Sequence, residues 1–394
     1  MRIVAIENLH ADAGWFTLSF LKIITDTGLV GWAEYRCDAG NAGLTDVIRA
    51  LAEPLIGADP RSVGAIATRL AARTVQARSG LNHQAIGAIV NALLDIKGKA
   101  YGVPVSALLG GQIREQIDVY WSHCGSYRLR HATLLDVPPV QTLTDLEQLG
   151  RHVRQAGFSA LKTSLLPLNG ESLSSFGPGF GWTAGFPALN AEPSVIRSAG
   201  LQMEAFRAGV GEDFQLMLDA NCHFKLEGFL KLARALAPHG LEWLEVDGLS
   251  PIDLAHLRRS SGTPIGSCEA VYGAAELLPF LSERAVDVVI VDANWNGYLE
   301  ALNMAVLAHA HGVNVATHGY GGLLSEIINA HFAASIPNLR IMEIDIDHVP
   351  WMADFYTGAP QVEQGILTLS SAPGWGIDVN EAAVRARPAP EKRG

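Results

Sequence analysis

Six ionisable residues in the second half of the chain follow one another at almost constant spacing. Each stands at the end of a short apolar run, and successive members are 23 to 26 residues apart. A lone acidic residue in such a place is usually a helix cap or a solvated loop residue. Six that share the period of one repeated unit indicate that their side chains gather at one active face. The six are Asp219, Glu245, Glu269, Asp292, His318 and Glu343.

The first three members are all carboxylates. Asp219, Glu245 and Glu269 end consecutive apolar runs, so their charges are expected to converge and to repel one another. A hard divalent cation relieves this repulsion, and a donor set made only of oxygen favours Mg²⁺ with positions left for water and substrate. The sequence therefore predicts a magnesium site.

The next two members, Asp292 and His318, pair an acid with an imidazole. An aspartate beside a histidine orients the ring and raises its basicity, so His318 is expected to remove a proton and later return it. A single histidine after an apolar run is more often structural. Its position beside Asp292, on the face that carries the carboxylates, favours the catalytic interpretation.

Polar neighbours of these residues have two open interpretations. Asn221 and His223 alternate with Asp219 in "DANCHF", which places them on the same face if the strand continues. They are expected either to contact substrate or to support the site. Asn294, in "DANWNGY", is equally consistent with turn chemistry and with recognition of substrate hydroxyls.

The elements that must position these groups are short and repetitive. From about residue 115, eight apolar runs alternate with helical segments, which predicts parallel strands buried on both faces and closed into a barrel. Before them, "FTLSFLKIITDTGLVGWAEY" predicts a hairpin and "NHQAIGAIVNALLDIKGKAYG" a helix. We therefore expect an α/β protein: an α+β capping domain over 1–114, a barrel over 115–350, and a C-terminal segment, 351–394, that returns to the cap.

Composition excludes several other classes of protein. The net charge of -11 and the absence of a basic cluster argue against nucleic-acid binding. No signal peptide and no apolar stretch of membrane-spanning length is recognisable, so a cytoplasmic protein with a small-molecule partner and no membrane contact is expected. The cysteines form no CxxC pair, which argues against disulfides, structural zinc and thiol catalysis. They are Cys37, Cys124, Cys222 and Cys268.

Taken together, this order of residues resembles the mandelate racemase subgroup of the enolase superfamily, in the mandelate racemase / muconate lactonizing enzyme family. The similarity covers nearly the whole chain, including "ALLDIKGKAYGVPVSALLGG" and "GWGIDVNEAAV". It implies a (β/α)7β barrel with an α+β cap, a carboxylate substrate and a symmetric homo-oligomer. Cap residues around His10 to Trp15 would close over the substrate.

The resemblance also implies roles for single residues. Asp219, Glu245 and Glu269 match the magnesium ligands, and Asp292 with His318 matches the general-base pair. Glu343 matches the acid that binds the substrate carboxylate, and Lys162 matches the first lysine of a Lys-x-Lys motif. The family's usual Glu-Glu-Pro reads Glu245-Val246-Asp247, so Asp247 is unexpected.

Ser164 stands where the second lysine of that motif is expected. That lysine is the second base of the racemases, and a serine hydroxyl cannot replace it unaided. A site with one base favours elimination: His318 removes the proton α to a carboxylate, and the β-hydroxyl leaves as water. The leading hypothesis is a Mg²⁺-dependent dehydratase that converts a sugar acid to a 2-keto-3-deoxy acid.

Two alternatives stay open. Racemisation or epimerisation of a 2-hydroxy acid requires another base, for which His123 and His223 are candidates. A non-catalytic sugar-acid binding protein is the alternative of another class. The insert at 165–194 is rich in glycine, proline and aromatics, which favours an ordered lid or a subunit contact. Its aromatic residues are Phe176, Phe180, Trp182 and Phe186.

Overall fold

The computed structural model describes residues 1–177 and 191–390. Phe180, Trp182 and Phe186 of the predicted lid lie outside these ranges. The N-terminal part forms an antiparallel sheet in the order β1-β2-β3. Gly28 at the turn between the last two strands has a φ of 82°, a backbone conformation that favours glycine, and this confirms the predicted hairpin. The strands are β1 (Ile3–Asp12), β2 (Thr17–Thr25) and β3 (Val30–Arg36).

Two helices, α1 and α3, contact this sheet, and α2 packs on α3, the longest, which was predicted from its apolar spacing. It ends at Gly102, whose φ of 68° provides a left-handed C-cap. A Cβ on Gly87 of this helix would lie 2.7 Å from the backbone nitrogen of Gly297, so the glycine lets the helix approach the barrel closely. The helices are α1 (Leu44–Ala52), α2 (Val63–Arg73) and α3 (Leu81–Tyr101), with short 3-10 turns at Ala39–Asn41, Glu53–Leu55, Val75–Ala77 and Val105–Leu108.

The eight predicted apolar runs are the strands of a closed parallel barrel, which confirms the expected fold. Within the described residues, each strand pairs with the next, and β13 pairs with β4 to close the ring. The strands are β4 (Gln116–Trp121), β5 (Ala160–Ser164), β8 (Gln215–Asp219), β9 (Trp243–Glu245), β10 (Ile265–Ser267), β11 (Val288–Val291), β12 (Asn314–Thr317) and β13 (Leu339–Ile344).

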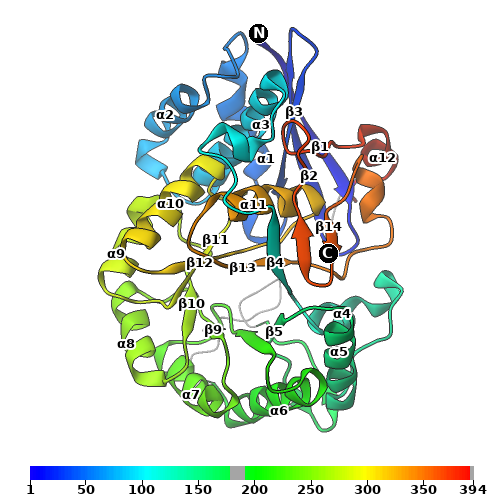
Figure 1. Ribbon diagram of the computed structural model, residues 1–394, viewed down its shortest axis with the longest axis vertical. Helices are drawn as coiled ribbons and strands as arrows, with labels where there is room; N and C mark the ends of the chain where they lie inside the picture. Colours follow the sequence, from blue (N-terminus) through cyan, green and yellow to red (C-terminus); the bar gives the residue numbers. More distant parts are fainter. Residues whose placement is uncertain (178–190, 391–394) are drawn as a thin grey trace.

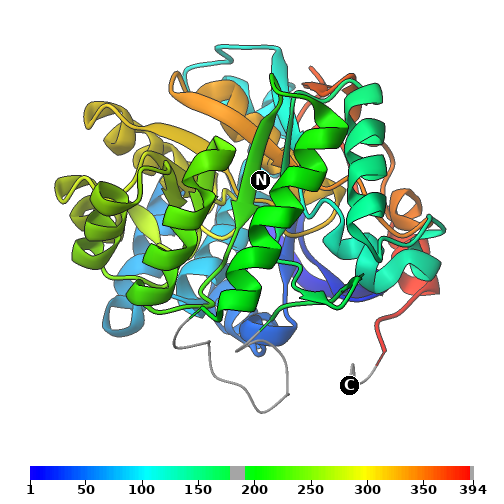
Figure 2. The ribbon, with the colours of Figure 1, turned by 90° about the horizontal axis from the view of Figure 1, so that it is seen from below.

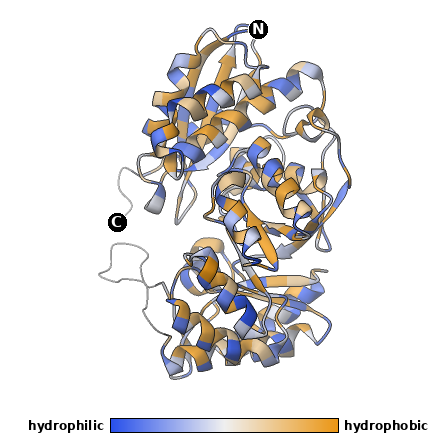
Figure 3. Ribbon diagram, turned by 90° about the vertical axis from the view of Figure 1, so that its left-hand side faces the viewer, coloured by the Kyte–Doolittle hydropathy of each residue, from blue (hydrophilic) through white to orange (hydrophobic). Residues whose placement is uncertain are grey.

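Helices surround the ring, and Figure 1 shows them in sequence order around the strands. Hydrophobic and hydrophilic residues alternate along them, as expected for helices with one face in the core (Figure 3). The helices are α4 (Ser126–Leu135), α5 (Leu143–Gln155), α6 (Pro193–Val210), α7 (Leu226–Leu236), α8 (Pro251–Ser261), α9 (Gly273–Ser282), α10 (Tyr298–Ala310) and α11 (Leu323–Ser335), with a 3-10 turn at Ala237–His239.

No α-helix follows β13 directly, so the barrel is of the (β/α)7β type. A 3-10 turn at Met352–Phe355 and an antiparallel hairpin come next, and the hairpin pairs with the start of β4. The chain then reaches the cap, where α12 packs against β1. These elements are β14 (Gln361–Glu363), β15 (Ile366–Thr368) and α12 (Glu381–Ala386), and a small hairpin in the β5–α6 connection comprises β6 (Leu168–Asn169) and β7 (Ser172–Leu173).

Side chains fill the barrel interior, so the barrel has a packed core. The interior cluster takes one residue from most of the strands, and its largest members are Tyr120 and Trp243, whose rings lie edge to face at 5.9 Å. The other members are Ala160, Met217, Val288, Ile290, Ala316 and Ile341. In the described residues, no helix is long and apolar enough to cross a membrane.

The cap lies over the loops that follow the barrel strands, and Figure 2 shows it against one side of the barrel. Glu34 on β3 accepts hydrogen bonds from the Gly322 N–H, which precedes α11, and from the Tyr356 hydroxyl. Asn91 on α3 donates to the Ala293 carbonyl, which follows β11. The cap therefore covers the carboxyl ends of the strands, where active sites of such barrels are built.

Candidate active site

The ionisable residues predicted from their spacing all lie at the carboxyl ends of the barrel strands. The strand register pairs Ser164 with Asp219, and Asp219 with Glu245. Lys162 is on β5 and Glu343 on β13, while the remaining members follow β10, β11 and β12 within two residues. They are Glu269, Asp292 and His318. The fold thus brings the predicted residues to one end of the barrel.

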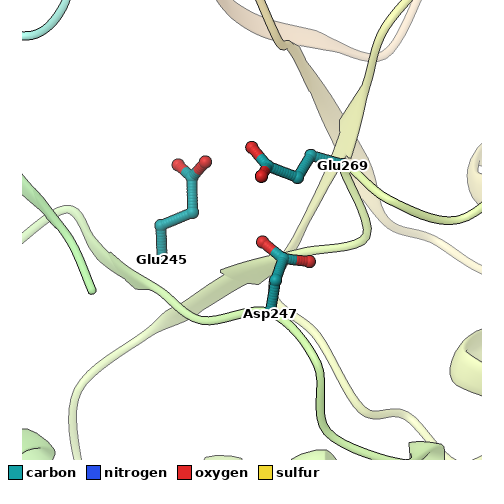
Figure 4. Close-up of side chains that lie close together, drawn as sticks. All are labelled: Glu245, Asp247 and Glu269. Atoms are coloured by element: carbon teal, nitrogen blue, oxygen red, sulfur yellow. The ribbon is translucent and has the colours of Figure 1, made fainter. Parts of the chain in front are cut away.

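The tightest carboxylate group consists of Glu245, Asp247 and Glu269. One oxygen of each lies within 4.8 Å of the others, and Figure 4 shows the three carboxylates pointing toward one another. Burial, together with the mutual repulsion of these charges, raises the pKa of all three, and that of Asp247 reaches about 8. Three oxygen donors this close are a suitable site for a hard divalent cation.

Asp247, which the family pattern did not anticipate, is oriented for this role. Its Oδ1 accepts hydrogen bonds from the Cys268 N–H at 3.0 Å and the Ser267 hydroxyl at 3.2 Å. Its Oδ2 is buried and has no hydrogen-bond partner among the described residues. A buried carboxylate oxygen without a donor is costly unless a cation or water satisfies it, so this oxygen fits a metal ligand.

Asp219, which the sequence predicted as a ligand, is not a member of that group. Its Oδ1 accepts the Asn221 N–H at 2.8 Å, two residues further along the chain. Its charge still contributes to the raised pKa values of Glu245, Asp247 and Glu269. Asp219 therefore lies close to the three carboxylates but is turned partly toward its own loop.

Lys162 is buried between two carboxylates. Its Nζ lies 3.0 Å from both oxygens of Glu245 and 2.8 Å from Oε1 of Glu343. Burial alone would lower the pKa of this lysine, but the two carboxylates raise it well above its usual value. Burial by itself would raise the pKa of Glu343, but Lys162, His318 and His123 together lower it to about 2. An ammonium held in this way carries charge and does not accept protons.

Ser164 lies on the same strand, two residues after Lys162. Its carbonyl, and the hydroxyl of the preceding Thr163, accept hydrogen bonds from the Gln202 amide at 2.8 and 2.9 Å. This fixes the end of β5 against α6. Ser164 thus neighbours Asp219 in the strand register, and by resemblance it offers a hydroxyl where the family motif has its second lysine.

His318 and Asp292 form the predicted pair. The Nδ1 of His318 lies 2.7 Å from Oδ2 of Asp292, and the other aspartate oxygen accepts the N–H groups of Asn294 at 2.6 Å and Trp295 at 3.0 Å. The two backbone donors fix the carboxylate, so that its second oxygen faces the ring. The opposite ring nitrogen, Nε2, lies 3.4 Å from Glu269.

The charge state of His318 follows from these neighbours. Burial lowers the pKa of the imidazole, but the carboxylates of Glu269 and Asp292 outweigh it and raise the pKa to about 10. The ring of Trp295 lies 4.7 Å from that of His318 and limits its movement. The charge of Glu269 is the largest cause of this rise in pKa, so a cation held by Glu269 would lower the pKa of His318 and allow the neutral, oriented ring to accept a proton at Nε2.

The remaining predicted contacts are spread around the rim of the site. Asn221 is half-buried and has a φ of 47°, so it shapes the loop after β8. His223 is buried with its ring edge-on to Phe176 at 5.1 Å. Asn294 donates from its amide to the Ser325 hydroxyl on α11 at 2.7 Å, and its Oδ1 is buried with no hydrogen-bond partner among the described residues.

Trp15 lies in the cap, where its ring stacks on that of His131 at 4.7 Å and contacts Tyr127 at 4.8 Å. It therefore covers the start of α4, on the β4 side of the barrel mouth. The cap also contributes Arg36, whose guanidinium lies between the rings of Phe16 and Tyr320, each at 4.2 Å. The sequence did not single out Arg36.

Another missed residue is Asp345, which accepts a hydrogen bond from His123 at 2.7 Å. A signal for it exists in "IMEID": Asp345 stands two residues after Glu343, and side chains two apart on a strand share a face. Asp247 has the same relation to Glu245. Both acidic residues lie just past the end of their strands; the sequence marked Asp247 only as unexpected and did not single out Asp345.

Comparisons with known proteins agree with this architecture. Residues 13–110 match the N-terminal domain of the mandelate racemase / muconate lactonizing enzyme family, and residues 145–383 match the enolase C-terminal domain-like family. D-galactarolactone cycloisomerase of Agrobacterium fabrum is 29% identical over 92% of this chain and 89% of its own length. A D-galactonate dehydratase family member of Streptomyces bingchenggensis is 29% identical, with 96% and 92% covered.

Among solved structures, a proposed L-alanine-DL-glutamate epimerase of Burkholderia xenovorans, bound to magnesium and fumarate, is 41% identical. The similarity covers 98% of this chain and 96% of that one, with a TM-score of 0.95. Both domains, the closed barrel and the residues at its mouth therefore lead to one conclusion: the chain belongs to the mandelate racemase / muconate lactonizing enzyme family of the enolase superfamily.

Proposed function

We propose that this enzyme is a Mg²⁺-dependent hydro-lyase that dehydrates a sugar acid of the aldonate or aldarate type to a 2-keto-3-deoxy acid. The observation that carries the proposal is the oriented His318–Asp292 pair beside the carboxylate group, with Ser164 in place of a second lysine base. The similarity to a D-galactonate dehydratase family member supports a sugar acid as substrate.

Magnesium is supported by the donor set and by one relative. Glu245, Asp247 and Glu269 would hold the ion, and Asp219 is a further candidate because it neighbours Glu245 in the strand register. The B. xenovorans protein is bound to magnesium and fumarate, which supports both a divalent metal and a carboxylate ligand here. When bound, Mg²⁺ would stabilise the negative charge that develops on the substrate carboxylate as the α-proton leaves.

The side chains of this chain divide the remaining work. His318 takes the α-proton at Nε2, while Asp292 holds the proton on Nδ1 and so fixes the tautomer. Lys162 contributes a fixed positive charge next to Glu343, at the place where a substrate carboxylate is expected. The C3–O bond then breaks, its electron pair leaves with the oxygen, and the enol product tautomerises to the keto acid.

Epimerisation is the second candidate, because the 41% identical relative is a proposed epimerase. Epimerisation at C2 in both directions needs a second group, on the other face of the substrate, that donates a proton and can also accept one. Lys162 is held as an ammonium and Ser164 is not a base, while His223 is enclosed by the rings of Phe176 and Phe224. Only His123, of the histidines named from the sequence, retains the position for that role.

The test is a screen of the Mg²⁺-loaded protein against a panel of sugar acids in D2O, followed by proton NMR. A deuterated 2-keto-3-deoxy product establishes the dehydratase and names its substrate. Deuterium at C2 with an inverted product and no keto acid establishes the epimerase instead. A non-catalytic binding protein would bind a sugar acid without turning it over. In that case wild type and His318→Asn would both show no turnover.

A further inference from the structure

A second histidine–aspartate pair lies at the same end of the barrel as the His318–Asp292 pair. The Nδ1 of His123, which follows β4, lies 2.7 Å from Oδ1 of Asp345, which follows β13. These two strands pair at the point where the barrel closes. Asp345 is buried, while the His123 side chain keeps 18% of its surface exposed. The pair is therefore oriented like the first one but open on one side.

The backbone holds His123 at the site with some strain. The Ser122 N–H donates to the Ile344 carbonyl at 2.9 Å, and the Cys124 N–H donates to the Lys162 carbonyl at 2.9 Å. Residue 123 is thus fixed between β13 and β5, with a φ of 47°, which is uncommon outside glycine. Strained backbone of this kind concentrates at functional sites.

The ring of His123 flanks the groups proposed to bind the substrate. It stacks on Tyr127 at 4.5 Å and lies 5.6 Å from the ring of Tyr320. The neighbouring Ser122 hydroxyl donates to Glu343, which is also bonded to Lys162. With Nδ1 bound to Asp345, the free atom is Nε2, for which the described part of the chain provides no hydrogen-bond partner.

His123 and His318 approach this region from different strands. His318 follows β12, and β13 with Glu343 stands between it and the strand that carries His123. The residues next to the two histidines hold the two oxygens of Glu343: the Ser122 hydroxyl, next to His123, donates to Oε1, and the Gly319 N–H, next to His318, donates to Oε2 at 2.7 Å. Two oriented imidazoles on either side of Glu343 are more than removal of one proton requires.

We propose that His123, oriented by Asp345, is the acid that protonates the leaving hydroxyl, distinct from the base His318. This inference rests on the proposed dehydration. His318 gains the C2 proton, and the C–H electron pair forms the C2–C3 double bond. As the C3–O bond breaks, the oxygen takes the proton from Nε2 of His123 and leaves as water, and the Nδ1 proton stays hydrogen-bonded to Asp345. His318 then releases its proton to solvent and His123 takes one up, which restores both histidines.

The experiment separates the two proton transfers. His123→Asn is the chosen variant because asparagine tolerates a positive φ better than most residues. C2 deuterium incorporation and keto-acid formation are measured in D2O with the Mg²⁺-loaded protein and the substrate from the screen. His123→Asn is expected to retain C2 exchange within about threefold while keto-acid formation falls by about 10² to 10⁴. His318→Asn is expected to lose both.

Two further variants serve as controls for this experiment. Asp345→Asn keeps the ring but not its orientation, so it is expected to show a smaller loss of the same kind. His309→Asn removes an exposed histidine on α10 and is expected to change neither rate. Thermal unfolding of each variant distinguishes misfolding from a chemical defect, and C2 exchange by folded His123→Asn serves as an internal control.

Each outcome decides the matter. Keto-acid formation by His123→Asn at a rate near wild type overturns the assignment of His123 and leaves the dehydratase standing. Equal loss of exchange and elimination in a folded variant also overturns it, because the residue would then support the site as a whole. If wild type forms no keto acid with any sugar acid of the panel, the proposed function fails and the role of His123 as leaving-group acid fails with it.

Discussion

Asp292→Asn tests the tautomer of His318 with almost no change in shape. One oxygen of Asp292 accepts the N–H groups of Asn294 and Trp295, and the other accepts from Nδ1 of His318. In the variant, the amide oxygen must stay with the two backbone donors. The amide nitrogen, which can only donate, then faces Nδ1, so the ring is expected to carry its proton on Nε2.

A ring protonated at Nε2 cannot accept the substrate proton there. The corresponding substitution in a serine protease triad lowers kcat by about 10⁴ for this reason. We expect a loss of about 10³ to 10⁴ in kcat, which corresponds to about 4 to 5 kcal/mol in activation free energy. Because Asp292 has no direct place in substrate binding, KM is expected to change by less than about threefold.

Two measurements check this prediction. Steady-state turnover and C2 deuterium exchange are compared between wild type, Asp292→Asn and the control Asp118→Asn, which changes an exposed carboxylate on β4. Nitrogen NMR of the histidine rings reports which ring nitrogen of His318 is protonated. A variant that keeps wild-type exchange, or one in which Nδ1 remains protonated while activity is lost, would refute the tautomer argument.

Three other predictions concern charge in the folded protein. Burial raises the pKa of Glu34 from 4.5 to about 7, so the wild-type protein is expected to lose roughly 3 kcal/mol of unfolding free energy as the pH rises from 4.5 through 7. Glu34→Gln is not expected to show this loss. A difference between the unfolding free energies of the two proteins that is the same at pH 5 and pH 8 would contradict this prediction. Lys162→Met leaves Glu245 and Glu343 without their cation and is expected to cost about 3 to 5 kcal/mol in urea unfolding of the metal-free protein. Mg²⁺ at about 100 times its Kd is expected to add about 2.7 kcal/mol to the unfolding free energy of the wild-type protein. Asp247→Asn is expected to weaken Mg²⁺ binding measured by calorimetry, and an unchanged affinity would show that Asp247 is not a ligand.

Much of the architecture follows from local pattern. The barrel strands are nearly continuous apolar runs because parallel strands are buried on both faces, and their regular spacing reflects one strand and one helix per unit. The carboxyl ends of such strands must meet at one edge. The spacing of Asp219 to Glu343 therefore predicted a shared face before any contact between these residues was known.

The pairing of individual side chains was harder to predict. Asp247 and Asp345 each stand two residues after an anticipated acid, and this spacing, although it is a signal, fits a residue of the following loop equally well. Asp247 belongs to the tight carboxylate group because the Cys268 N–H, 21 residues away, holds one of its oxygens. The orientation of Asp219 toward Asn221 is likewise a property of the folded loop.

The sequence by itself determined the kind of barrel, the face that carries the chemistry and the residue types available on it, because strand period and unit length act locally. Only the tertiary structure decided which charges meet. His123 and Asp345 are 222 residues apart and come together because β13 pairs with β4 when the barrel closes. Lys162 binds Glu245 and Glu343 at once because side chains from three strands point to one buried place, where unpaired charge is costly.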